Sequence, residues 1–131
     1  LIERWTFWMA EKKINDTFGH DAGDAVLKEM AKRLKASVRQ TDTVARLGGD
    51  EMGIILPEIE TNETAEDVAE RIIHSFKEPF YFNDNEIIIG AGIGISYYPE
   101  HSIDKKQLIK FADEALYEAK KSKENVYRIY Q

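Results

Sequence analysis

The chain has 131 residues, of which 43% are hydrophobic and 32% are charged, a composition typical of one globular domain and unlike that of a disordered or fibrous protein. Its net charge is −6, and lysines and arginines are spread among the acidic residues, which excludes the basic face that a nucleic-acid polymer needs. Cysteine is absent and no apolar run approaches the ~20 residues of a membrane span, so we expect a cytoplasmic protein without disulfides, thiolate metal sites or a membrane segment.

The first eleven residues are rich in large apolar side chains. Leu1, Trp5 and Trp8 stand at spacings of four and three, which favours a helix. Residues 10–13, Ala-Glu-Lys-Lys, are good helix formers as well. A strand is the alternative, although apolar and polar residues alternate poorly here. A start at Leu1 without methionine indicates a fragment or a processed chain.

A helix and a hairpin are predicted next. Over residues 24–38 the apolar residues recur at intervals of three and four, which predicts an amphipathic helix. Residues 43–47 and 52–56 favour two strands, and the Gly-Gly pair between them predicts a hairpin turn. Pro57 ends the second strand because proline cannot donate to a sheet ladder.

The rest of the chain alternates between strands and helices. A helix over 64–77 would begin with Thr64 as its N-cap. The remaining predicted elements are strands over 80–82 and 86–97 joined by a turn at 83–85, a helix over 104–122 and a strand over 126–130. Gly90, Gly92 and Gly94 alternate along the longer strand, which indicates that another element packs closely against the sheet. The order predicts one domain over residues 1–131 with an α/β (α+β) fold, a mixed central sheet with helices packed over it.

The predicted hairpin turn, Gly-Gly-Asp-Glu at residues 48–51, places two adjacent carboxylates after two glycines. Adjacent residues on a strand point to opposite sides, so one carboxylate can meet a divalent metal while the other faces elsewhere. The glycines let a ligand approach the backbone closely. A solvated turn would use the same four residues, so the tetrapeptide alone decides nothing.

Several other motifs surround this turn. They are Ile-Asn-Asp-Thr-Phe-Gly-His at 14–20, Gly-Asp at 23–24, Arg-Gln-Thr-Asp at 39–42, Gly-Ile-Gly-Ile-Ser at 92–96 and Ala-Asp-Glu-Ala-Leu-Tyr-Glu-Ala-Lys at 112–120. In this order and spacing they resemble the GGDEF family of diguanylate cyclases, over about residues 12–131. Members of that family join two GTP molecules into cyclic di-GMP, one GTP being held by each domain of a dimer.

The resemblance implies a nucleotide site. Asn15 and Asp24 would contact the edge of the guanine, while Lys12 and Lys120 would meet the triphosphate as flexible cations. Simpler roles remain open for all four, because Asn15 and Asp24 can cap helices and the lysines can belong to solvated helix faces.

The resemblance also implies a metal site and an inhibitory site. Asp50 would bind Mg²⁺ or Mn²⁺, and Glu51 would help to activate the attacking 3′-hydroxyl. Arg39 and Asp42 match the family's RxxD site for the cyclic di-GMP product. A plain ion pair at i, i+3 is the alternative for these two residues.

The N-terminal segment breaks the family pattern. Family members reach this region through an Asp-x-Asp strand, and counting back eight residues from Asn15 puts Phe7 and Met9 at the two carboxylate positions. Phe7 would then lie opposite Asp50 and offer hydrocarbon where a metal expects charge. Glu124 stands where the family usually has an arginine, and the helix and loop that normally precede the first strand are absent. We therefore expect impaired or absent catalysis, with metal binding in doubt.

Three explanations of this segment remain open. In the first, the domain is degenerate or truncated and either binds nucleotide weakly or acts as a regulatory module. In the second, its N-terminus has been replaced or engineered. In the second case Trp5, Phe7, Trp8 and Met9 would form a surface for a protein partner or a homodimer. In the third, these side chains fill the core in place of the missing helix.

Overall fold

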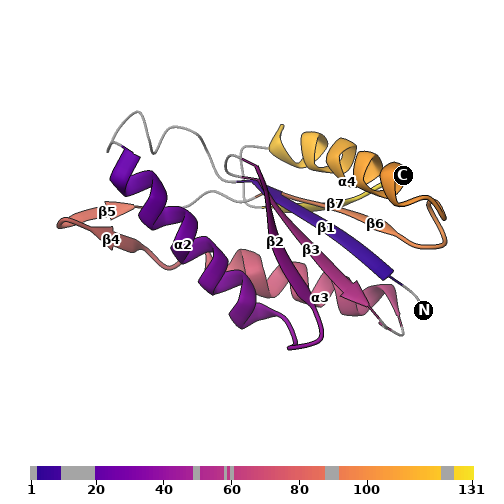
Figure 1. The fold of residues 1–131 in the computed structure, drawn as a ribbon, viewed down its shortest axis with the longest axis horizontal. Coiled ribbons are helices and arrows are strands. Elements are labelled where there is room, and N and C mark those ends of the chain that lie inside the picture. Colours follow the sequence, from indigo (N-terminus) through magenta and orange to yellow (C-terminus); the bar gives the residue numbers. More distant parts are fainter. Residues whose placement is uncertain are drawn as a thin grey trace.

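A computed structural model of the chain describes residues 3–9, 20–48, 51–57, 59, 61–87, 92–121 and 126–131. Its centre is a five-stranded sheet in the order β2-β3-β1-β6-β7 (Figure 1). The pair β6–β7 is parallel and the other pairs are antiparallel. The predicted mixed sheet is therefore confirmed.

Strand β1 (Glu3–Met9) lies in the middle of this sheet, between β3 and β6. The helix that we favoured for this segment is wrong, and the strand alternative is correct. Local spacing is a weak guide over so few residues, whereas backbone pairing on both sides fixes the extended conformation.

The predicted hairpin is formed by β2 (Thr43–Gly48) and β3 (Glu51–Pro57). The register of the pair shifts between Arg46 and Gly48, next to the turn. Such an irregularity bends the strand and increases its twist, so it shapes the end of the hairpin where the Gly-Gly-Asp-Glu motif lies. Strand β3 ends at Pro57, as predicted.

Helix α4 (Lys105–Lys120) connects β6 (Gly92–Tyr97) to β7 (Val126–Ile129), and the two strands are parallel neighbours. A parallel pair needs such a crossover connection. Asp104 is the N-cap, and its carboxylate accepts a hydrogen bond from the Lys106 N–H at 3.3 Å. The predicted helix over 104–122 is confirmed apart from its ends.

One face of the sheet lies against α4 at very short range (Figure 1). A Cβ atom added to Gly94 would lie 2.9 Å from the Leu116 Cα and still closer to the Ala112 carbonyl oxygen and the Leu116 nitrogen. Two residues further along β6, the Ser96 hydroxyl donates to the Leu108 carbonyl at 2.7 Å. The predicted close packing is therefore present at Gly94, and Gly90 lies outside the described residues.

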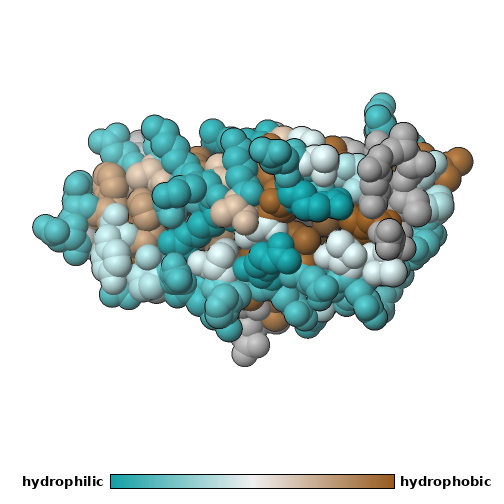
Figure 2. Space-filling model, turned by 90° about the horizontal axis from the view of Figure 1, so that it is seen from below, coloured by the Kyte–Doolittle hydropathy of each residue, from teal (hydrophilic) through white to brown (hydrophobic). Residues whose placement is uncertain are grey.

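The opposite face of the sheet carries the main core, under α2 (His20–Ser37) and α3 (Asn62–Ser75). The core residues include Val26, Met30 and Leu34 from α2, Val68, Ile72 and Phe76 from α3 and its C-cap, and Ile54, Leu56, Ile93, Ile95 and Tyr97 from the strands. Seen from below, this side of the molecule is mainly hydrophilic, as amphipathic helices require (Figure 2). Thr64 is not the N-cap of α3, because the helix begins at Asn62 and Thr61 precedes it.

The predicted long strand over 86–97 is wrong, because it is two strands in different sheets. Strand β5 (Asn85–Ile87) pairs with β4 (Phe80–Phe82) in a separate two-stranded sheet, while β6 joins the central sheet. Asn83 and Asp84 have φ values of 48° and 66°, as a two-residue hairpin turn of the primed type requires. No helix within the described ranges is long and apolar enough to cross a membrane.

Candidate functional site

The end of the sheet next to the Gly-Gly-Asp-Glu turn brings together three strands. Glu51 of β3 is paired with Met9 of β1, and Met9 is paired on its other side with Gly92 of β6. We call Glu51, Met9 and Gly92 the turn-end row. The glutamate is half-buried, and it is the carboxylate that this row contributes.

Lys120 reaches the same end of the sheet from the last turn of α4. A Cβ atom added to Gly92 would lie 3.6 Å from the Lys120 Cγ, so the exposed lysine rises from directly above the turn-end row. Strand β1 separates Glu51 from Gly92, which puts them about 10 Å apart at the usual strand spacing. An acidic and a basic residue thus lie at one end of the sheet.

Phe7 does not lie opposite Asp50, and that expectation is wrong. The antiparallel register pairs Phe7 with Gly53 on one side and with Gly94 on the other. Each step along β3 toward the turn is matched by a step toward the C-terminal end of β1, so Met9 is the β1 residue at the turn end. Phe7 therefore occupies the sheet centre, two residues from the turn-end row.

Of four other predicted site residues, the structure describes one, Asp24. Lys12, Asn15 and Asp50 lie outside the described residues. Asp24 is exposed on α2, four residues after the helix begins at His20. It is therefore too far along the helix to be its N-cap, and the capping alternative for Asp24 is wrong.

Arg39 and Asp42 form a short bidentate pair. The Arg39 guanidinium donates to the two carboxylate oxygens at 3.1 and 3.3 Å, and the Arg39 backbone N–H donates to one of them at 2.7 Å. The Asp42 side chain is 1% exposed and that of Arg39 is 53% exposed. The ion pair at i, i+3, which we named as the alternative for these two residues, is therefore present in the structure.

The guanidinium of Arg39 also donates to the Pro57 carbonyl at 2.8 Å, which ties the pair to the end of β3. Two hollows of about 290 and 140 Å³ adjoin both Arg39 and Asp42. The pair therefore holds the arginine in a fixed orientation at the rim of these hollows.

Among the described residues, the turn end of the sheet offers too few oxygen donors for a divalent metal, and Asp50, the predicted ligand, lies outside them. Mg²⁺ and Mn²⁺ prefer several oxygen ligands, and the turn-end row supplies one carboxylate beside Met9. Over the described ranges, no group of three or more histidine, aspartate or glutamate side chains could hold a metal ion.

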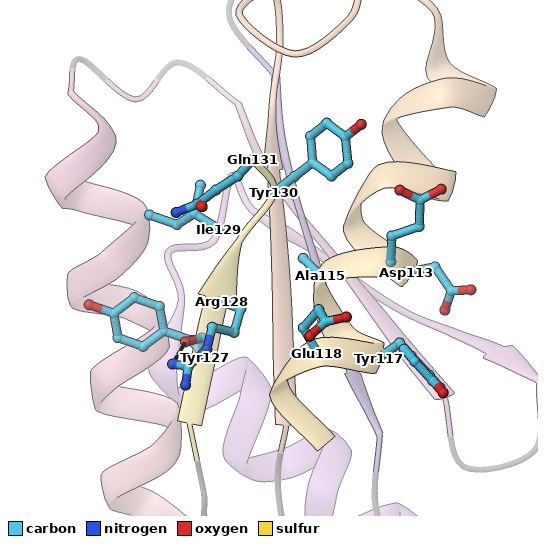
Figure 3. A pocket seen from close by; sticks show the side chains of 10 residues that line it. Asp113, Ala115, Tyr117, Glu118, Tyr127, Arg128, Ile129, Tyr130 and Gln131 are labelled. Atoms are coloured by element: carbon cyan, nitrogen blue, oxygen red, sulfur yellow. Dashed lines mark hydrogen bonds between the residues drawn. The ribbon is translucent and has the colours of Figure 1, made fainter. Parts of the chain in front are cut away.

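A larger hollow, of about 840 Å³, was not predicted from the sequence. It lies between α4 and β7 (Figure 3). The acidic and tyrosine side chains at α4 positions 113, 114, 117 and 118 were a signal for it, because they share one helix face that does not belong to the core.

A family model described as "Diguanylate cyclase, GGDEF domain" matches residues 11–126. The chain belongs to the GGDEF family. The match begins after β1, so the strand that carries Phe7 and Met9 lies outside it.

Individual proteins and solved structures are also similar to this GGDEF domain. The signaling protein YkoW of Bacillus subtilis is 42% identical over 120 residues, which are 91% of this chain and 15% of YkoW. The solved GGDEF domain of TpbB from Pseudomonas aeruginosa is 35% identical with a TM-score of 0.95, covering 99% of this chain and 77% of that one. The GGDEF domain of DgcB from Caulobacter crescentus, solved in complex with c-di-GMP, is 22% identical with a TM-score of 0.85 over 98% of this chain and 78% of that one. At that identity the likeness shows the fold alone.

Proposed function

We propose that this GGDEF domain binds guanine nucleotides but catalyses the formation of cyclic di-GMP poorly or not at all. The proposal rests on the composition of β1, the central strand of the sheet, where Phe7 and Met9 stand at the two positions that the resemblance to the family gives to carboxylates. Met9 is paired with Glu51, so an apolar residue adjoins the acid expected to act on the 3′-hydroxyl.

The expected loss is large because phosphoryl transfer depends mainly on positioning and on electrostatic stabilisation of the transferring group. A missing anionic ligand removes the charge that holds a cation there. Each ~1.4 kcal/mol of transition-state stabilisation corresponds to about a tenfold change in rate. A loss of several kcal/mol lowers turnover by several orders of magnitude.

The proposed nucleotide binding depends on residues other than Phe7 and Met9. Asp24 and Lys120 are both exposed, and Lys120 rises above the turn-end row. With Lys12 and Asn15 they form the set that would contact the guanine and the triphosphate. A second ligand, cyclic di-GMP, would use Arg39 and Asp42.

Calorimetric titration with GTP tests the binding part of the proposal. We expect measurable affinity that changes less than threefold when Mg²⁺ is replaced by EDTA, because β1 carries Phe7 and Met9 in place of the carboxylates that would help to hold a metal. Asp24→Ala should weaken binding at least tenfold, because a hydrogen bond to a charged group contributes about 1.5–3 kcal/mol.

Asp21→Ala is the matched control, because Asp21 is an exposed aspartate of the same helix, in its first turn. It should leave the affinity unchanged. If GTP fails to bind, or if both variants bind as the parent does, nucleotide binding through Asp24 is refuted.

A further inference from the structure

Strand β7 is an edge of the sheet, because it pairs with β6 and with no other described strand. The Tyr130 N–H donates to the Ile95 carbonyl of β6 at 2.8 Å. Backbone groups alternate along a strand, so those of Arg128 also point to β6 while those of Tyr127 and Ile129 point away from the sheet. The edge thus presents two N–H and two C=O groups.

One of these outward groups is covered by the chain itself. The Arg128 guanidinium donates to the Tyr127 carbonyl at 3.2 Å, and Arg128 is exposed. The Ile129 N–H and C=O point away from β6, and no other described strand pairs with β7 on that side. A strand with such groups is a template for pairing with another extended chain.

The large hollow lies along this edge, between β7 and the outer side of α4 (Figure 3). Its volume, about 840 Å³, is that of a typical ligand-binding cleft. The α4 side carries Asp113, Glu114 and Glu118, all exposed. A side chain that enters the hollow from a bound strand therefore meets carboxylates.

The other side of the edge is acidic too. The Tyr127 hydroxyl lies 3.2 Å from a Glu66 carboxylate oxygen and 3.4 Å from one of Glu70, both on α3. Five carboxylates thus flank the β7 edge, three from α4 and two from α3. Arg128 is the basic residue on the strand itself.

The rim of the hollow already holds a cation in the way that a basic ligand would be held. The Lys121 ammonium lies 4.8 Å from the centre of the Tyr117 ring and 3.1 Å from a Glu118 carboxylate oxygen. Tyr117 is 64% exposed, so its ring is open to a ligand as well. An ammonium or guanidinium gains from both the ring face and the carboxylate.

We propose that the β7 edge binds an extended segment of a partner protein rich in lysine or arginine, which adds to the sheet as a sixth strand. The outward groups of Tyr127 and Ile129 would form the ladder, and carboxylates on both sides would receive the basic side chains. A second copy of this chain fits poorly, because the net charge of −6 and the five flanking carboxylates repel another acidic surface.

Fluorescence anisotropy with a labelled seven-residue peptide of alternating lysine and valine tests this inference. The lysine peptide should bind, whereas a glutamate and valine peptide should not. The triple variant Asp113→Asn, Glu114→Gln, Glu118→Gln should weaken binding at least tenfold. Arg128→Ala should strengthen it severalfold, because it removes a like charge and uncovers the Tyr127 carbonyl.

Two controls separate strand addition from general attraction to an acidic protein. The triple variant Glu78→Gln, Asp84→Asn, Glu86→Gln changes the net charge equally at exposed positions in or next to the separate β4–β5 hairpin, and should bind within twofold of the parent. A peptide methylated on its backbone amides should lose at least tenfold in affinity. Equal affinity for the methylated peptide, equal effects of the two triple variants, or no binding by the lysine peptide would each overturn the proposal.

Discussion

Gly94 sits beneath α4 at the point where the helix comes closest to the sheet. A side chain there would meet backbone atoms of Ala112 and Leu116, which cannot move without moving the helix. Gly92, two residues away, differs. A Cβ there would meet side-chain atoms at 3.4 to 3.7 Å, which is ordinary contact.

These two glycines form a matched pair for mutation. We expect Gly94→Ala to lower the free energy of unfolding by about 1–3 kcal/mol or more, the usual cost of overpacking, because α4 must shift. Gly92→Ala should change it by less than about 1 kcal/mol. Urea unfolding of both variants measures the difference, and equal losses would contradict the close approach of α4.

Arg39 links the ion pair with the proposed product site. Arg39→Ala removes the guanidinium at the rim of the two hollows, so the affinity for cyclic di-GMP should fall at least tenfold, by ~1.4 kcal/mol or more. Lys32→Ala is the control, because Lys32 is exposed on α2 and adjoins neither hollow. Calorimetry gives both affinities. Equal affinity in the parent and Arg39→Ala would remove Arg39 from the site.

At the scale of elements, α3 and β7 are joined by the Tyr127 hydroxyl. Burial, and then the nearby charges of Glu66 and Glu70, raise the pKa of Tyr127 above its ordinary value of 10.0. The folded state thus keeps the phenol proton at pH values where the unfolded state has lost it. Tyr127 stabilises the fold fully below about pH 10, and this contribution is lost as the pH rises from there through the raised pKa.

Replacing the phenol tests this pH dependence. The difference in unfolding free energy between the parent and Tyr127→Phe should be smaller at pH 11 than at pH 9. Tyr81→Phe, at a tyrosine 65% exposed on β4, should show no such change. Urea unfolding at the two pH values measures it. A difference that stays constant would contradict the raised pKa.

Most elements were predictable because their signals are local. Periodicity located the helices, and the Gly-Gly pair and Pro57 bounded the hairpin. Two failures share a cause. The identity of β1 and the division of residues 86–97 between two sheets depend on pairing with distant strands, which short-range spacing does not encode.

At the scale of the whole molecule, the sequence located the site only in part. It assigned Glu51 and Lys120 through family motifs, and the fold brings both to one end of the sheet. It misplaced Phe7 relative to the turn, because register is set by the pairing of β1 with β3. The large hollow between α4 and β7 was not predicted, because it is formed by a helix face and a sheet edge that come together only in the fold.

The interaction surface proposed for the N-terminal aromatics gains no support from the fold. Strand β1 is paired on both sides, and helices cover the two faces of the sheet that contains it. Such a strand offers no backbone edge to a partner. The edge at β7 is the better candidate for contact with another protein.

The rate of cyclic di-GMP formation from GTP and Mg²⁺ or Mn²⁺ tests the central claim most directly. It should be measured with the purified chain at high protein concentration, so that two domains can meet, beside the TpbB GGDEF domain. We predict a rate for this chain at least a thousandfold below that typical of enzymes, about 10 per second, because β1 carries Phe7 and Met9 where carboxylates are needed. Turnover at an ordinary enzymatic rate would contradict the account.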